Sequence, residues 1–237
     1  MFKHILVFAL AISTALPVSF AHARTSSDPL LVDQWHLQKV SAQQAWDTTV
    51  GGDVIVAVLD TGMDIDHEDL HDNIYTTPGE VDDGIDNDGN GFIDDMHGWD
   101  FFHDDNQPST THLTSSDGIG VHHATIVAGV IGAVGNNGKG VAGVSWDVSI
   151  LPVQVLTAEG NGSTPDIVEG IDYAVAMGAD VINLSFVGNQ NTSGLNSALQ
   201  RAYDAGVIIV AAMGNENQNL DREPLYPVCS PGLSGNN

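Results

Sequence analysis

The chain has 237 residues, of which 42% are hydrophobic and 6% aromatic, so it can bury one sizeable core but is short for two. Its 31 acidic and 6 basic side chains give a formal net charge of −25 at pH 7. That charge repels phosphate backbones and anionic lipids, so neither nucleic acid nor a membrane surface is an expected partner. About half of the acids lie between Asp64 and Asp105. Such local clustering predicts cation binding.

Residues 1–23 have the pattern of a signal peptide. Lys3 provides the positive start, an apolar stretch runs from Ile5 to Leu16, and Ala21-His22-Ala23 fits an A-x-A cleavage site. A membrane anchor is the alternative, but the stretch is shorter than the ~20 residues that span a bilayer. We therefore expect a secreted protein with no membrane segment after cleavage. The single cysteine, Cys229, excludes an internal disulfide.

An N-terminal tail is expected over residues 24–34, flexible from Arg24 to Asp28, followed by a single domain over residues 35–237. Near its start, Ser41 is expected to cap a short helix from Ala42 to Asp47, with Trp46 as its anchor.

Apolar runs rich in β-branched residues then alternate with helical patterns. The runs predict strands buried on both faces, at Val54 to Leu59, Val148 to Leu156, Val181 to Phe186 and Val207 to Ala212. The helical patterns cover Thr125 to Ala133, Asp166 to Met177 and Gly194 to Ala205. This alternation predicts an α/β fold, a doubly wound parallel sheet with helices on both faces.

Active sites of such sheets gather at the carboxyl ends of the strands. Asp60 in Asp60-Thr61-Gly62 follows the first strand directly, although an Asp in this position often only caps a turn. His122 and His123 introduce the next helix, where an imidazole can meet Asp60. A buried Asp that holds a His nitrogen fixes its tautomer and stabilises the imidazolium formed during nucleophilic catalysis. Asn215, after Gly214, can aim an amide donor at an oxyanion.

Three motifs occur in the order and context of the subtilisin-like serine proteases, and the chain resembles that family from about Trp35 to Pro227. They are Val-Ala-Val-Leu-Asp-Thr-Gly, His-x-Thr-x-Val-Ala-Gly and Ala-Ala-x-Gly-Asn-Glu. The resemblance implies a serine endopeptidase in which Asp60 orients the base, His123 is the general base and Asn215 stabilises the oxyanion. Ala124 and Ile126 depart from the family's His-Gly-Thr-His, which leaves His122 as a rival base, but the register of the following residues favours His123.

The resemblance also implies that two segments pair with an extended peptide substrate. One is Ser185-Phe186-Val187-Gly188, and the other is Gly160-Asn161-Gly162 across the cleft. Glycine-rich loops have many other uses, so the second assignment is the weaker one. Val187 replaces a family glycine and is expected to narrow or reshape the primary specificity pocket. We expect a monomer.

The family's Gly-Thr-Ser-Met-Ala nucleophile motif does not occur in the sequence. Ser230 and Ser234 lie in a different context. We therefore expect a peptidase domain truncated before its nucleophile and inactive by itself. A fragmentary record, a truncated gene and a pseudoenzyme remain alternative explanations.

An acidic loop resembles both an EF-hand loop and the calcium-binding insert of some subtilisin-like proteases. Asp86, Asp88 and Asn90 occupy its first, third and fifth positions, and Phe92 would offer a backbone carbonyl. His97 replaces the usual closing Glu, so Asp94 or Asp95 would supply that carboxylate. This density of oxygen ligands favours Ca²⁺. The alternative is a solvated acidic loop.

The family implies a weaker second calcium site at Asp69 and Asn137. The leading hypothesis is thus a secreted, calcium-stabilised serine endopeptidase. The alternatives are a non-catalytic calcium- or peptide-binding module on the same scaffold and an acidic calcium-dependent adhesion fragment.

Overall fold

The structure is a computed structural model that describes residues 24–109 and 122–231. Its centre is a parallel sheet of five strands in the order β2-β3-β1-β4-β5. In chain order the strands are β1 (Gly51–Asp60), β2 (Trp99–Asp100), β3 (Asp147–Gln154), β4 (Val181–Leu184) and β5 (Ile208–Ala211). β1 is central, with β3 pairing along one side and β4 along the other. The predicted parallel α/β sheet is confirmed.

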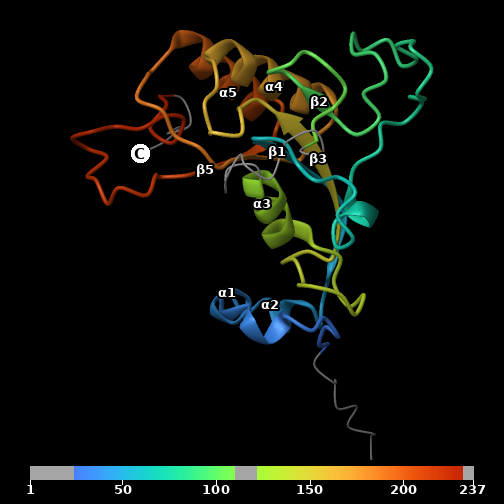
Figure 1. Cartoon of the computed structure of the whole chain (residues 1–237). Helices are drawn as coiled ribbons and strands as arrows, with labels where there is room; N and C mark the ends of the chain where they lie inside the picture. Colours follow the sequence, from blue (N-terminus) through green and yellow to red (C-terminus); the bar gives the residue numbers. More distant parts are fainter. Residues whose placement is uncertain (1–23, 110–121, 232–237) are drawn as a thin grey trace, which may run out of the picture.

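Helices cover both faces of this sheet (Figure 1). α4 (Thr164–Ala176) and α5 (Ser193–Asp204) pack on one face, and α3 (His123–Gly132) packs on the other. Alternate residues of β1 serve the two layers: Ala57 and Leu59 join the α4 and α5 core, while Val56 and Val58 join the α3 core. This two-sided burial explains why β1 reads as an unbroken apolar run.

Two of the predicted helix starts have side-chain caps. Ser163 Oγ accepts from the backbone N–H of Asp166 at 3.3 Å before α4, and Thr192 Oγ1 accepts from the backbone N–H of Leu195 at 3.3 Å before α5. Each satisfies one of the free N–H groups that a helix start exposes. These caps account for the agreement between the predicted and observed starts.

The N-terminal elements are short: a 3₁₀ turn at Leu31–Asp33, α1 (Trp35–Lys39) and α2 (Ala42–Ala45). Another 3₁₀ turn covers His71–Asn73. Trp46 is buried against Trp146, with ring centroids 4.5 Å apart, as its predicted anchoring role requires. The predicted cap at Ser41 is wrong, because Ser41 has a φ of 58° and its side chain makes no capping hydrogen bond.

None of the helices in the described residues has both the length and the apolar character needed to cross a membrane. The predicted signal peptide at residues 1–23 lies outside the described residues.

Candidate active site

Asp60 is the last residue of β1 and places its carboxylate at the carboxyl edge of the sheet. Its side chain is 1% exposed, and its Oδ1 accepts the backbone N–H of Thr61 at 2.7 Å. Gly62 permits the sharp turn that follows. It has a φ of +91°, and a Cβ there would lie 2.4 Å from Gln154 Oε1 at the end of β3. The turn therefore holds the carboxylate in one orientation.

His123 is the first residue of α3 and points back to Asp60. Its Nδ1 lies 2.8 Å from Asp60 Oδ1 and 2.9 Å from Asp60 Oδ2. Ala124 and Ala128 bury one face of α3 against the sheet, which fixes where the helix begins. The imidazole remains 45% exposed, so its other nitrogen can serve a reacting group. His122, the residue before the helix, is exposed.

A cavity of about 730 Å³ brings His123 together with Asn215, the residue predicted to stabilise an oxyanion. Asn215 is exposed and lies just beyond β5, whose continuation is held by a hydrogen bond from Ala212 N–H to Leu184 O at 3.0 Å. Thr61 and Ser185 also line this cavity. His123 and Asn215 thus border one open space, while Asp60 lies buried behind His123 and does not line it.

Both segments predicted to bind peptide line the same cleft. Gly160 and the 185–187 stretch border the 730 Å³ cavity. A neighbouring cavity of about 480 Å³ is lined by all of Gly160, Asn161 and Gly162, together with Phe186, Val187 and Gly188. Gly188 is paired with Tyr226 by two backbone hydrogen bonds of 2.8 and 2.9 Å. Both predicted segments therefore border the cleft, but the N–H and the carbonyl of Gly188 are taken up by Tyr226 and are not free to pair with an extended peptide.

Among the residues that line the 730 Å³ cavity, Ser185 is the only serine, and its Oγ accepts a hydrogen bond from Asn183 Nδ2 at 2.8 Å. Ser230 is 3% exposed and does not line the cavity. Ser234 lies outside the described residues. The residues that line the cavity therefore include the predicted base and the predicted oxyanion donor, and Ser185, the serine among them, is bonded to Asn183.

Comparison with known proteins shows the family of the chain. The profile of the Subtilase family, peptidase S8, matches residues 51–237. The chain belongs to the subtilase family. Thermitase from Thermoactinomyces vulgaris is 35% identical over 203 residues, which cover 85% of this chain and 62% of thermitase. Halolysin from Haloferax mediterranei is 34% identical, over 86% of this chain and 35% of halolysin.

Solved structures give the same assignment. A protease from Pseudoalteromonas arctica superposes with a TM-score of 0.61 at 35% identity, over 83% of this chain and 61% of that protein. A cold-adapted subtilisin-like serine proteinase superposes with a TM-score of 0.55 at 27% identity, over 77% of this chain and 54% of its own. The subtilase chain described here thus spans less than two thirds of the relatives it matches.

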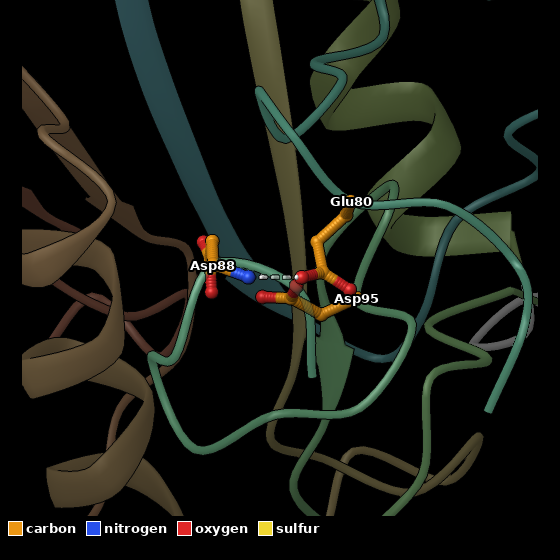
Figure 2. A group of neighbouring side chains, drawn as sticks. All are labelled: Glu80, Asp88 and Asp95. Carbon is orange, nitrogen blue, oxygen red and sulfur yellow. Dashed lines mark hydrogen bonds between the residues drawn. The ribbon is translucent and has the colours of Figure 1, made fainter. Parts of the chain in front are cut away.

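The acidic loop of this subtilase folds back so that carboxylates of Glu80, Asp88 and Asp95 come together (Figure 2). One oxygen from each lies within 4.8 Å of the others. Glu80 Oε1 accepts the backbone N–H groups of Asn87 and Asp88, at 2.7 and 2.8 Å. Glu80 Oε2 and Asp95 Oδ1 are buried without a hydrogen-bond partner. Two buried carboxylate oxygens without partners are costly unless a cation offsets them.

The ligand set predicted from the sequence shares Asp88 and Asp95 with this cluster but did not include Glu80. Asp86 accepts backbone N–H groups of Gly89, Asn90 and Gly91, which lower the pKa of its carboxyl. Asp94 accepts those of Asp83 and Gly84. These two carboxylates shape the loop from within. The Asn90 amide donates to Asp95 Oδ2 at 3.0 Å, beside the cluster.

Asp95 also joins the loop to α4. It accepts a 2.7 Å hydrogen bond from the Tyr173 hydroxyl, and Phe92 packs edge-on against the Tyr173 ring at a centroid distance of 4.9 Å. Burial raises the pKa of the Asp95 carboxyl, and the charges of Asp88 and Glu80 raise it further, against the hydrogen bonds from Tyr173 and Asn90. Burial and then the bond to Asp95 raise the pKa of the Tyr173 hydroxyl, which therefore stays a donor.

The second predicted pair, Asp69 and Asn137, is also brought together. Asn137 Nδ2 donates to Asp69 Oδ1 at 2.8 Å, and the Val141 N–H donates to Asp69 Oδ2 at 2.8 Å. Asp28, which the sequence did not single out, accepts backbone N–H groups of Asn136, Asn137 and Gly138 in the same loop. The buried carboxylates of Asp28 and Asp69 thus both anchor the connection from α3 to β3.

Proposed function

We propose that this subtilase chain forms most of the catalytic domain of a secreted, calcium-stabilised serine endopeptidase. The observation that carries the proposal is the contact of His123 Nδ1 with buried Asp60, beside a cavity that Asn215 also lines. Subtilase membership supports it, and several relatives are extracellular, including the halolysin-like protease of Natrialba magadii and the minor protease Epr of Bacillus subtilis.

The proposed chemistry is acyl transfer. A serine hydroxyl attacks the peptide carbonyl while His123 accepts the hydroxyl proton, and Asp60 holds the imidazole and stabilises the resulting imidazolium. The Asn215 amide donates to the oxyanion of the tetrahedral intermediate. His123 then returns the proton to the leaving amine, and the same steps with water release the acyl group.

Because no serine in the described cavity contacts His123, we predict that the 237-residue chain alone does not hydrolyse peptide bonds. The test is incubation with casein and with a serine-reactive fluorophosphonate probe, with thermitase as the positive control. The expected result is no casein cleavage and no His123-dependent labelling. Labelling of Ser185 or Ser230 that is lost in His123→Ala would show that the chain carries its own nucleophile and would overturn the prediction.

The same labelling experiment distinguishes an endopeptidase from the alternative, a non-catalytic binding module. A polypeptide that contains residues 1–237 and a Gly-Thr-Ser-x-Ala segment should label and cleave if the endopeptidase proposal is right. Absence of labelling in such a polypeptide, with calcium present and the fold intact, would favour the non-catalytic binding module on the same scaffold.

The residues that would hold calcium in the acidic loop are Glu80, Asp88 and Asp95. Their hard oxygen donors suit Ca²⁺, and their two buried oxygens without partners fit a bound cation. Bound calcium would offset the repulsion among the carboxylates and hold Glu80 next to Asp88 and Asp95. Asp69 and Asn137 are a second proposed location, where both Asp69 oxygens already accept N–H groups in this arrangement.

We predict that Ca²⁺ raises the melting temperature through the acidic loop. A ligand that binds only the folded state contributes about 2.7 kcal/mol at a hundredfold excess over its Kd. Glu80→Gln and Asp88→Asn keep side-chain volume but remove charge, so both should shrink the calcium-induced shift measured by circular dichroism. Asp204→Asn, on α5 away from the loop, is the matched control and should leave the shift unchanged. An equal shift in all four proteins would place any bound calcium elsewhere, with Asp69 the next candidate.

A further inference from the structure

Three buried polar side chains lie next to one another at the carboxyl edge of the sheet. Gln154 ends β3, and it is the register partner of Asp60 at the end of β1 and of Asp100 at the end of β2. Asp60 and Gln154 are 1% exposed, and Asp100 is 0% exposed. The residue before each of them belongs to the core under α4 and α5, so all three point to the α3 face. Gln154 therefore separates two buried carboxylates.

Each of these carboxylates holds a histidine. Asp60 Oδ1 lies 2.8 Å from His123 Nδ1, and Asp100 Oδ2 lies 2.6 Å from His103 Nδ1. Burial raises the pKa of the Asp100 carboxyl, against the hydrogen bonds from His103. Two strand spacings of roughly 4.8 Å put the backbones of Asp60 and Asp100 about 10 Å apart. A third carboxylate between them would lie at half that distance from each and would repel both strongly in this buried site.

The amide of Gln154 also connects the turn after Asp60 to the wall of the substrate cleft. Its Nε2 donates to Leu156 O at 3.4 Å, and the Leu156 N–H donates to Asp60 O at 3.1 Å. Leu156 borders both cavities of the cleft. On its other side the amide lies against Gly62, where a Cβ would be 3.0 Å from Gln154 Cδ. Gln154 thus fills the space beside the 60–62 turn.

Stability alone does not explain an amide at this position. Gln154 Oε1 is buried and has no hydrogen-bond partner in the described part of the chain. A buried acceptor without a donor costs stability, and an apolar side chain of similar length would avoid that cost. The neighbours of the amide account for it better, because it fills the space beside Gly62 and bonds to Leu156 without adding a charge between Asp60 and Asp100.

We infer that Gln154 is a positioning residue, a neutral side chain that separates Asp60 from Asp100 and holds the 60–62 turn so that Asp60 keeps its contact with His123. The inference rests on the proposed function, in which that contact orients the base. Gln154 touches neither His123 nor the open cavity and acts through Asp60.

The test records the low-field ¹H NMR signal of the His123 Nδ1 proton in the intact chain across a pH series. A proton in a short bond to a buried carboxylate is strongly deshielded, so this signal reports the contact with Asp60 without requiring a nucleophile. It is assigned by its loss in His123→Ala. Gln154→Ala leaves a void beside Gly62, so the signal should move upfield or be lost to solvent exchange. Gln154→Met keeps the side-chain length without a charge and should leave the signal near its wild-type position.

Gln154→Glu tests the need for a neutral side chain, because the added carboxylate should repel that of Asp60 and displace the signal. Gln44→Glu, exposed on α2, is the matched control for charge. Val148→Ala is the matched control for lost volume, because Val148 is buried on the same face at the other end of β3. It should lower the melting temperature and leave the signal unchanged.

A signal that is unchanged in Gln154→Ala would overturn the positioning role, even if the melting temperature falls, because a merely structural residue would give that result. An unchanged signal in Gln154→Glu would overturn the need for neutrality. Both results leave the proposed function standing. A wild-type signal that does not respond to Asp60→Asn would instead contradict the Asp60–His123 contact, and with it both the inference and the proposed function.

Discussion

The proposed chemistry depends, at the scale of single residues, on which of two adjacent histidines meets the buried carboxylate. Asp60 holds His123 through Nδ1, whereas His122 is exposed one residue before the helix. An imidazole without the carboxylate lacks both its fixed tautomer and the charge that stabilises its protonated form. Only His123 therefore has the partner that the proposed base requires.

We predict that His123→Ala abolishes turnover and His122→Ala leaves most of it, in a polypeptide that contains this chain and a nucleophile. Loss of the corresponding His in subtilisin costs about 2 × 10⁶ in kcat, and we expect a loss of that order on the strength of that relative. The measurement is kcat/KM on a chromogenic peptide. The reverse result would mean that His122 replaces His123 on Asp60 during catalysis.

Some residues of the candidate site could be predicted from the sequence, and others could not. Asp60 was predictable because it ends a strongly patterned strand, whereas His123 was chosen over His122 only through the register of the family motif. Glu80 was not, because it lies outside the regular Asp and Asn spacing and reaches Asp88 only when the loop folds back. Asp28 was missed for the same reason, since its partners at 136 to 138 are more than 100 residues away in sequence.

At the scale of elements, α4 connects the acidic loop to the peptide cleft. Tyr173, near its end, bonds to Asp95, while Thr164 and Ile167, near its beginning, line the smaller cavity. Phe92 and Phe101 pack edge-on around Tyr173, at centroid distances of 4.9 and 5.7 Å. The loop is therefore part of the packing that positions α4.

We predict that Tyr173→Phe lowers the free energy of unfolding by about 1.5–3 kcal/mol, the usual contribution of a hydrogen bond to a charged group. The ring contacts survive this change, but Asp95 loses a buried donor. Urea unfolding followed by circular dichroism measures the effect. Tyr203→Phe is the control, because Tyr203 is 54% exposed on α5 and should change stability by less than about 0.5 kcal/mol. Equal effects of the two substitutions would show that the Asp95 bond adds no stability.

Elements with strong periodicity were predictable to within a few residues, and those formed by tertiary context were not. The predicted strand Val54 to Leu59 lies within β1, whose two-sided burial leaves a continuous apolar run. β2 has only Trp99 and Asp100, too few residues to show a period, and it exists because both pair with β3. Ser41 was misread because a capping residue type says nothing about the left-handed backbone that it adopts.

For the whole molecule, 31 acidic side chains are balanced by only 6 basic ones, which leaves a net charge of −25 at pH 7. In the described residues, the ion pairs formed by Lys or Arg are those of Arg201 with Asp172 at 2.6 Å and Lys139 with Glu68 at 3.9 Å. Their side chains are between 42% and 74% exposed, so each pair contributes little. Self-repulsion of the remaining carboxylates therefore opposes the folded state, where they lie closer together than in the unfolded chain.

We predict that stability rises with monovalent salt, separately from its response to calcium. The Debye length falls from about 30 Å at 0.01 M to about 3 Å at 1 M ionic strength, so added NaCl should screen the repulsion and raise the melting temperature. KCl should act equally, because screening depends on valence, whereas Ca²⁺ should act at far lower ionic strength.

Glu80→Gln should keep the salt response and lose most of the calcium response, since it changes one charge in 25 but removes one of three clustered carboxylates. Melting temperatures that do not change with NaCl would show that self-repulsion is negligible. A calcium shift reproduced by NaCl at equal ionic strength would show that calcium acts by screening and not by binding at the loop.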